Sequence, residues 1–177
     1  DVVRRKLGVT RKVVFEKHSI TFGFNVAAAP GTFFDFPALT CYGEQISDGI
    51  DYLNIFPIGS VMRANLFTFR DHRDPWLRDI RNHPEDTLLK TIPGIKPFLG
   101  AFQIASKVEN WAQDLYVVDN YLQDGVVLIG DCFQTSCPAA GTGVGRLLID
   151  VDQLCNLHLP RWLETPGMEA SKIAQFY

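Results

Sequence analysis

Asp131 is the residue of this chain whose surroundings most favour chemistry. It follows Gly130 and an apolar run from Val126 to Ile129. A carboxylate that comes directly after a buried strand lies where open sheets bind ligands, and its charge strengthens the hydrogen bonds it accepts. Asp131 therefore suits a sugar or ribitol hydroxyl and would repel a phosphate. A second interpretation stays open, in which the side chain only caps a turn by accepting bonds from nearby backbone N–H groups.

A proline- and glycine-rich loop follows this aspartate and leads into an amphipathic run. Its candidate ligand-contacting positions are Pro138, Gly141, Thr142, Gly143, Val144 and Gly145. Glycines let a backbone approach a ligand closely, and the start of a helix presents unsatisfied N–H groups and a positive dipole end. The alternative is a flexible loop without a ligand. The spacing completes neither a G-x-G-x-x-G fingerprint nor a phosphate loop, since no further glycine and no Lys-Ser/Thr pair follow.

Composition excludes several classes of protein. The 177 residues carry a net charge of -3, are 46% hydrophobic and 21% charged, and include four cysteines without zinc-type spacing. Such a chain lacks the basic footprint of a nucleic-acid-binding protein and has no apolar run long enough for a membrane span. No signal peptide is visible, so we expect a cytoplasmic protein with reduced thiols. Both ends read as interrupted elements, which predicts a piece of a larger protein.

The pattern along the chain predicts the elements that position these residues. Residues 1–8 read as the end of a helix, and 13–26 alternate as a half-buried strand. A short strand at 33–34 or 39–42 and a hairpin of strands at 52–58 and 61–70 follow. Prolines then start two helices, at 76–81 and 85–91.

The remaining third of the chain returns to strands and ends on a helix. Residues 106–118 read as a strand interrupted near 113–114, and 126–129 as a strand buried on both faces. From Val144 to His158 apolar residues recur at helical spacing, so this helix is expected to bury one face. The order predicts an α+β (α/β) protein with a mostly antiparallel sheet, divided into domains at 1–118 and 119–177.

The strand–loop–helix unit resembles the second flavin-contact motif of the FAD-dependent aromatic hydroxylases, the p-hydroxybenzoate hydroxylase family. The residues that match this motif are Gly130, Asp131, Pro138, Gly141, Gly143 and Asp150. Arg4 and Leu7-Gly8 are similar to another stretch of the family. The sequence departs from the motif at Cys132-Phe133-Gln134, where Ala-Ala-His is usual, and at Gly145, where Asn is usual.

The resemblance implies a role for each part of the chain. Residues 1–118 would hold the substrate-binding sheet, and 119–177 the C-terminal part of the FAD-binding domain. It implies that Asp131 binds the FAD ribitol and that the backbone from Pro138 to Gly145 lies along the isoalloxazine ring. The family's N-terminal dinucleotide-binding unit is absent from these residues, so we expect this chain alone to bind FAD weakly or not at all.

Other side chains are weaker candidates. Cys132 and Cys137 are a possible redox pair or metal site, although buried free cysteines are the default interpretation. The four histidines have no paired ligand spacing. Arg63, Asn65 and His72 are candidates to face a substrate, with a surface ion pair as the alternative for Arg63. An aromatic pocket is a further candidate, with core packing as its alternative, and its residues would be Phe33, Phe34, Phe36, Tyr42 and Trp111.

Three functions remain open from the sequence. The favoured one is a fragment of a flavin-dependent monooxygenase that hydroxylates an aromatic or other apolar small molecule with FAD, NAD(P)H and O2. The fragment alone would be inactive. A homodimer stays open for the whole protein, and neither a nucleic-acid partner nor a membrane span is expected. The alternatives are a flavin reductase similar to the geranylgeranyl reductases and a non-catalytic binding module that lacks the nucleotide half.

Overall fold

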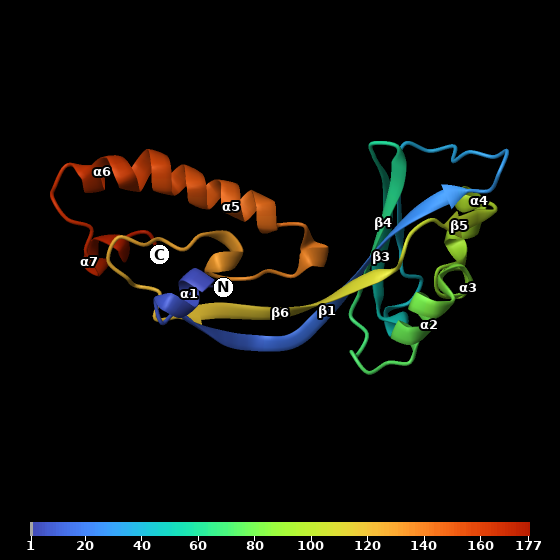
Figure 1. The fold of residues 1–177 in the computed structure, drawn as a ribbon, viewed down its shortest axis with the longest axis horizontal. Helices are drawn as coiled ribbons and strands as arrows, with labels where there is room; N and C mark the ends of the chain where they lie inside the picture. The colour runs from blue at the N-terminus through green and yellow to red at the C-terminus, as the bar shows by residue number, and fades with distance from the viewer. Residues whose placement is uncertain (1) are drawn as a thin grey trace. The chain divides into compact units, whose positions relative to one another are not determined.

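The computed structural model describes residues 2–177, which form two compact units (Figure 1). Residues 2–16 and 114–177 make up one, here called the loop unit, and residues 17–113 the other, called the sheet unit. Two long strands, β1 (Thr10–Ala28) and β6 (Glu109–Asp119), have residues in both. The sequence-based boundary between residues 118 and 119 assigned residues 2–16 and 114–118 to the sheet domain, whereas in the structure they belong to the loop unit. The functions assigned to the two parts stay predictions.

The sheet unit is built on antiparallel strands. β2 (Leu39–Tyr42), β3 (Ile50–Ile58), β4 (Val61–Thr68) and β5 (Phe102–Ile104) join β1 in the order β2-β3-β4-β1-β5, and β6 also pairs with β1. The predicted hairpin is present, with Ile58 opposite Val61, and a short 3-10 helix, η1 (Ile46–Asp48), precedes it. The predicted α+β class with a mostly antiparallel sheet is confirmed.

One stripe of β1 forms the centre of the core. Ile20, Phe22, Phe24 and Val26 are at most 4% exposed, because their side chains alternate onto the same face of the strand. On the neighbouring strand, Leu66 lies opposite Phe22 and Ala64 opposite Phe24, and both are fully buried. The period-two pattern of the sequence therefore predicted both the strand and its buried face.

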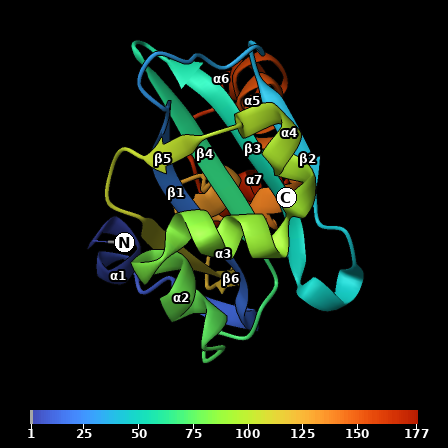
Figure 2. The same cartoon turned by 90° about the vertical axis from the view of Figure 1, so that its right-hand side faces the viewer.

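Helices cover this face of the sheet, as Figure 2 shows for α2 and α3. α2 (Trp76–Asn82) and α3 (Pro84–Thr91) are followed by η2 (Pro93–Ile95) and α4 (Lys96–Leu99). Proline is favoured in a first helical turn because it has no N–H to leave unsatisfied and its φ is already helical. The core residues that these helices contribute are Leu77, Ile80, Leu88, Ile95 and Leu99.

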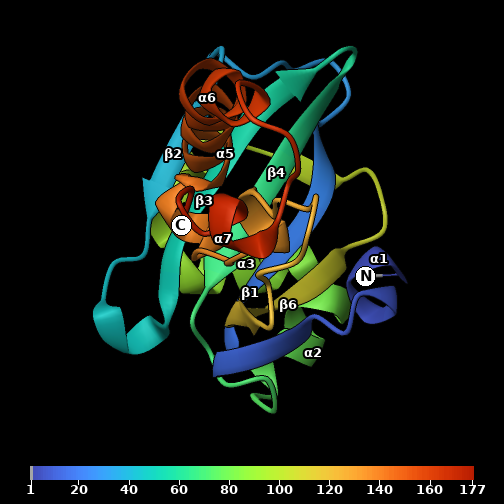
Figure 3. The same cartoon turned by 90° about the vertical axis from the view of Figure 1, so that its left-hand side faces the viewer.

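The loop unit has short helices around a second, smaller core. α1 (Val2–Lys6), η3 (Gly130–Cys132), η4 (Pro138–Ala140) and α5 (Gly143–Asp152) belong to it. α5 continues through a π-helical segment, η5 (Gln153–His158), into α6 (Leu159–Leu163), and the chain then returns through a loop to α7 (Ala170–Ile173), as Figure 3 shows. The core consists of Val9, Tyr116, Val118 and Leu128.

The strand predicted at 126–129 is not formed. Only Leu128 in this run is buried, and its N–H donates to the Tyr177 hydroxyl oxygen at 2.7 Å while its carbonyl accepts from the same hydroxyl at 3.2 Å. A strand requires a neighbouring strand for its backbone groups. Within residues 2–177, no strand pairs with 127–129, so one tyrosine side chain takes part of that role.

The prediction that α5 buries an apolar face is wrong for this chain. The helix is present, but Val144, Leu148 and Ile149 are 71%, 63% and 62% exposed. Amphipathic spacing fixes which residues share a face, whereas burial depends on a partner surface. The described residues leave this helix largely uncovered, which makes it an exposed apolar surface of the kind that marks an interaction site.

Two details of the sheet also differ from the sequence-based prediction. β6 runs without interruption through Gln113-Asp114, and the three-residue strand β5 was not foreseen. β5 is held by pairing with β1, where Ile104 lies opposite Val26. Three residues carry too little periodicity to reveal such a strand, because tertiary pairing decides it. In addition, no helix among the described residues is long and apolar enough to cross a membrane.

We predict that Phe22→Ala destabilises the sheet unit by about 3–5 kcal/mol, because it leaves a cavity at a fully buried position. Phe33→Ala is the matched control, since that ring is 83% exposed, and it is expected to change stability by less than about 0.5 kcal/mol. Urea unfolding of the two variants measures both values. Equal losses of unfolding free energy in the two variants would contradict the assignment of Phe22 to the core.

Candidate functional site

The Gly130–Asp131 turn is held from the side of α5. The Gly130 N–H donates to Asp150 Oδ2 at 2.9 Å, which joins the turn to the helix twenty residues later. Gly130 has a left-handed φ of 54°, and a Cβ there would lie 3.1 Å from Leu147 Cδ1. Both the backbone conformation and the space therefore favour glycine at this position. Asp150, matched to the family motif by spacing, thus fixes the turn.

The Asp131 carboxylate is exposed and has no hydrogen-bond partner among residues 2–177. The turn-capping interpretation therefore does not describe this structure. Its backbone carbonyl, by contrast, accepts a hydrogen bond from the Tyr116 hydroxyl at 2.8 Å. The Asp131 backbone is held by this hydrogen bond, whereas the side-chain oxygens have no partner in the described chain. The carboxylate can therefore accept hydrogen bonds from a ligand.

Tyr116 on β6 organises this region and was not identified from the sequence. Its hydroxyl accepts a bond from Arg4 Nη1 at 3.2 Å, and the Arg11 guanidinium lies over its ring at 4.5 Å from the centroid. Thr135 adds a second attachment, since its hydroxyl accepts from the Tyr116 N–H at 2.9 Å. Tyr116 is 8% exposed. These partners lie 15 to 112 residues away in sequence, and no local pattern indicates them.

The glycine-rich loop ends on an open helix N-terminus. Pro138 begins η4, Gly141 has a left-handed φ of 64°, and Thr142 stands at the N-cap of α5 without a side-chain capping bond. Within the described residues, the N–H groups of Gly143–Gly145 have no acceptor, and the first bond runs from the Arg146 N–H to the Thr142 carbonyl. Three free donors and the positive dipole end favour an electron-rich group here.

The space around these glycines would allow a ligand to approach their backbone closely. A Cβ at Gly141 or Gly145 would meet no atom within 4 Å, and one at Gly143 would meet only Ser136 Oγ at 3.9 Å. Packing inside the described chain therefore does not require glycine at these three positions, although the φ of Gly141 does. The eight positions predicted from sequence form a turn and a helix start, with Gly130 held to α5 through Asp150.

The sheet unit has an open face opposite its helices. Arg63 and Asn65 lie on it, with Arg63 Nε donating to Asn65 Oδ1 at 3.3 Å. The guanidinium lies over Gly23, where a Cβ would collide with it, and Trp111 lies against the same point. No carboxylate in residues 2–177 forms an ion pair with Arg63, so the surface-pair alternative is not what the structure shows.

Aromatic and amide groups lie on the same face, farther along β3 and β4 from Arg63. Tyr52 packs on Phe67 at 4.6 Å and on Tyr42 at 6.1 Å between ring centroids, and Asn54 Oδ1 is buried without a hydrogen-bond partner. The predicted five-residue aromatic pocket is not assembled: Phe33 is exposed, while Phe34 and Phe36 stack together against the core. The face instead joins Tyr42 and Trp111 to residues that the sequence did not single out.

The remaining candidates have ordinary surroundings. Cys132 and Cys155 are exposed and Cys41 and Cys137 half-buried, all four as free thiols, so the default of buried cysteine is wrong for Cys132. Burial raises the pKa of the Cys41 thiol. His72 lies beside Asp71 and away from Arg63, in a loop before α2. No group of three potential metal ligands exists among residues 2–177.

Comparison with known proteins identifies the fold. No protein-family model and no curated protein matches the chain. The flavin-dependent brominase Bmp2 superposes with a TM-score of 0.68 at 14% identity, over 99% of this chain and 44% of its own. The flavin-dependent halogenase CmlS gives 0.66 at 15%, over 98% and 31%. Aklavinone-11 hydroxylase, solved with FAD and aklavinone, gives 0.58 at 17%, over 92% and 29%.

The chain thus spans less than half the length of each of these solved structures. At such identities the likeness establishes the fold alone. This chain has the fold of part of the FAD-dependent halogenases and aromatic hydroxylases, as the resemblance of its motif implied.

We predict that Tyr116→Phe loosens the Asp131 turn, because it removes the hydroxyl that donates to the Asp131 carbonyl. The loss of one such bond is expected to cost about 0.5–1.5 kcal/mol and to speed amide hydrogen exchange at residues 132–134. Tyr42→Phe, at a tyrosine that is 70% exposed, is the control and should change neither quantity. Unchanged exchange in the Tyr116 variant would show that the turn holds its shape without this bond.

Proposed function

We propose that this chain is part of a flavin-dependent monooxygenase that hydroxylates an aromatic or other apolar small molecule using FAD, NAD(P)H and O2. One observation carries the proposal: the Asp131 carboxylate has no partner in the described chain, although the Asp131 carbonyl and the neighbouring Gly130 N–H are held by Tyr116 and Asp150. A held backbone that presents an unsatisfied carboxylate is suited to a ligand. We also propose a cytoplasmic location, which rests on composition alone.

The residues of the loop unit fit FAD. Asp131 would accept hydrogen bonds from ribitol hydroxyls, and the free N–H groups of Gly143–Gly145 would face the electron-rich edge of the ring system. When bound, FAD would supply the redox chemistry, as a carrier of electrons from NAD(P)H to O2. The chain's own part would be to orient the cofactor and to stabilise negative charge on it through the α5 dipole.

The open face of the sheet unit would bind the substrate. Tyr52, Phe67 and Trp111 offer flat apolar surface to an aromatic ring. Arg63 would supply a donor that fixes its orientation, because no carboxylate of the described chain pairs with it. This division of roles follows the family resemblance, in which the sheet holds the substrate.

The apolar surface of α5 indicates that a further part of the same flavoprotein covers this helix. This helix exposes three large apolar side chains on its surface, those of Val144, Leu148 and Ile149. Exposed apolar patches of this kind are usually covered by another part of the protein or by a partner. The solved structures that share the fold have more than half of their length outside the matched region. The backbone at 127–129, which has no neighbouring strand among the described residues, suits the same partner.

Halogenation is the second candidate, favoured by the fold that this chain shares with Bmp2 and CmlS. Both reactions need bound flavin, reductant and O2, so the product separates them. Incorporation of bromide or chloride into an aromatic substrate would identify a halogenase, and incorporation of an oxygen atom from O2 would identify a hydroxylase. Reduction of a polyprenyl chain without oxygen consumption would overturn both in favour of the reductase alternative.

The central test uses a longer polypeptide that contains this chain. We predict that it takes up FAD, and that Asp131→Ala weakens FAD affinity about 10- to 100-fold, since a charged acceptor for ligand hydroxyls is lost. Asp35→Ala, at an exposed loop position of the sheet unit, is the control and should leave affinity within twofold. Flavin fluorescence titration gives each value. Failure of the parent polypeptide to bind FAD would sink the proposal.

A second prediction concerns the exposed face of α5. Leu148→Lys should leave the stability of the 177-residue chain within about 0.5 kcal/mol, because this side chain is 63% exposed. In the longer polypeptide it should destabilise the protein and release FAD, since a charge would be buried against the covering part. Thermal unfolding of both forms measures the contrast. If Leu148→Lys leaves the thermal stability of both the 177-residue chain and the longer polypeptide unchanged, α5 is not covered in either.

A further inference from the structure

A pocket of about 370 Å³ lies in the sheet unit on the side of α2. Its wall includes the loop before α2, α2 itself, and Asn110 and Ala112 of β6. This region belongs to neither the open face of the sheet nor the Asp131 turn. Its lining combines apolar atoms of Pro75 and Ala112 with an accumulation of cationic side chains.

Two arginines dominate this wall. Arg78 and Arg81 are three residues apart on α2 and therefore share one side of the helix. Arg81 Nη1 donates to Asn110 Oδ1 at 3.3 Å, a neutral partner that orients the guanidinium without neutralising it. Arg78 has no hydrogen-bond or ion-pair partner among residues 2–177. Lys17 and His72 also line the pocket.

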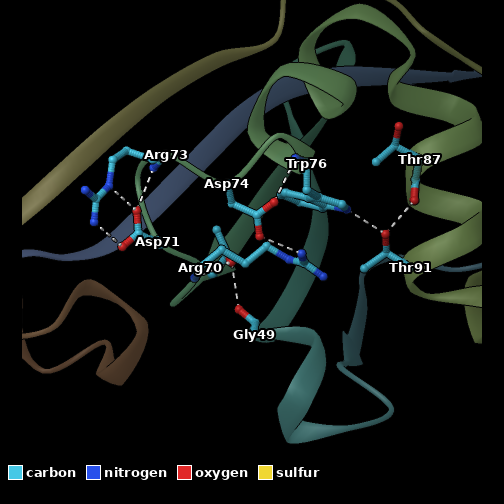
Figure 4. Close-up of polar contacts among 9 residues, drawn as sticks. Gly49, Arg70, Asp71, Arg73, Asp74, Trp76, Thr87 and Thr91 are labelled. Carbon is cyan, nitrogen blue, oxygen red and sulfur yellow. Dashed lines mark hydrogen bonds and ion pairs between the residues drawn. The ribbon is translucent and has the colours of Figure 1, made fainter.

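Two acidic groups beside this wall, Asp71 and Asp74, are already engaged, as Figure 4 shows. Asp74, the carboxylate of the pocket wall, accepts from Arg70 Nη1 at 2.9 Å through Oδ2 and from the Trp76 N–H at 2.9 Å through Oδ1. Asp71 is bound by Arg73 at 3.2 Å, and this hydrogen bond lowers the pKa of Asp71 to about 2. Neither carboxylate is thus left to neutralise the two arginines.

Trp76 makes this wall rigid. Its indole N–H donates to Thr91 Oγ1 at 2.9 Å, its ring packs edge-on against Phe22, and the Arg70 guanidinium lies over it at 4.8 Å from the centroid. Trp76 begins α2, the helix that carries Arg78 and Arg81. The two cations consequently stand on an element anchored to the core, as a binding site requires.

Positive charge continues beside the pocket. Two adjoining pockets share Arg81 with it and add Lys107, and each of them also includes one carboxylate, Glu85 in the first and Glu109 in the second. The first pocket itself is lined by four cationic side chains and one carboxylate, in a chain whose net charge is -3. Such a concentration attracts anions, and a low-dielectric wall strengthens the attraction.

We propose that this pocket binds the phosphate group of a small phosphate ester, with Arg78 and Arg81 as its ligands. Guanidinium groups bind phosphate through paired N–H donors. Two arginines match the double negative charge of a phosphate ester better than the single charge of a carboxylate ligand. The pocket is larger than a bare phosphate ion, so its apolar portion at Pro75 and Ala112 would hold the esterified part. This site is independent of the proposed flavin chemistry, because none of its residues belongs to the Asp131 turn or the open face.

The test uses the 177-residue chain with inorganic phosphate, pyrophosphate and glycerol phosphate as probes, and acetate as the carboxylate comparison. Calorimetry should show saturable binding of the phosphate compounds that weakens as ionic strength rises. Arginine side-chain NMR should show the Nε–H signals of Arg78 and Arg81 shifting on titration. Acetate should bind at least about tenfold more weakly than glycerol phosphate, since it presents one charge and two acceptor oxygens.

Variants complete the test. Arg78→Gln and Arg81→Gln should each weaken glycerol phosphate binding at least about tenfold, because each removes a charged ligand. Arg161→Gln, on the exposed surface of α6, is the matched control and should stay within twofold. The NMR titration of the unaltered chain keeps the proposal testable if a variant fails to fold. Shifts spread over all arginines, equal binding of acetate or the absence of saturation would overturn it.

Discussion

The Gly130–Asp131 turn depends on hydrogen bonds between its backbone and two side chains, one on β6 and one on α5. Tyr116 on β6 donates to the Asp131 carbonyl, and Asp150 on α5 accepts from the Gly130 N–H. Because both backbone groups are satisfied by these partners, the Asp131 carboxylate is not needed to cap the turn. The availability of that carboxylate for a ligand is thus a consequence of where β6 and α5 lie. Arg4 extends the same arrangement, since it donates to the hydroxyl that holds the turn.

The two faces of the strands in the sheet unit differ in character. One face of β1 and β4 is buried under α2 and α3 and contains only apolar side chains near its centre. The other face carries the polar side chains Arg63, Asn65 and Asn54. Alternation along a strand makes this possible, since neighbouring residues point to opposite faces. α2 has a similar division, with Leu77 and Ile80 in the core and Arg78 and Arg81 along a pocket.

Two features of the loop unit share one physical cause. α5 leaves its apolar side chains exposed, and the apolar run at 127–129 has no neighbouring strand. Each is a surface that gains free energy by being covered, the first through burial of apolar area and the second through backbone pairing. The Tyr177 hydroxyl satisfies Leu128 in place of a strand, and burial beside that segment raises the pKa of Tyr177. Both surfaces agree with the proposal that a further polypeptide segment covers them.

The sequence by itself determined the local elements and the motif. Alternation in β1 predicted a strand, the Gly59-Ser60 turn predicted the hairpin, and the prolines at the starts of α2 and α3 predicted helices. These signals act between residues that are close in the chain. The spacing from Gly130 to Asp150 likewise indicated the flavin-contact motif and, through it, the fold that the solved structures share. Tertiary structure alone decided whether Val126 to Ile129 pairs as a strand and whether α5 is covered. It also decided that Tyr116 anchors the turn and that Arg78 and Arg81 remain without carboxylate partners. These outcomes depend on which distant surfaces meet, and no local pattern of residues contains that information.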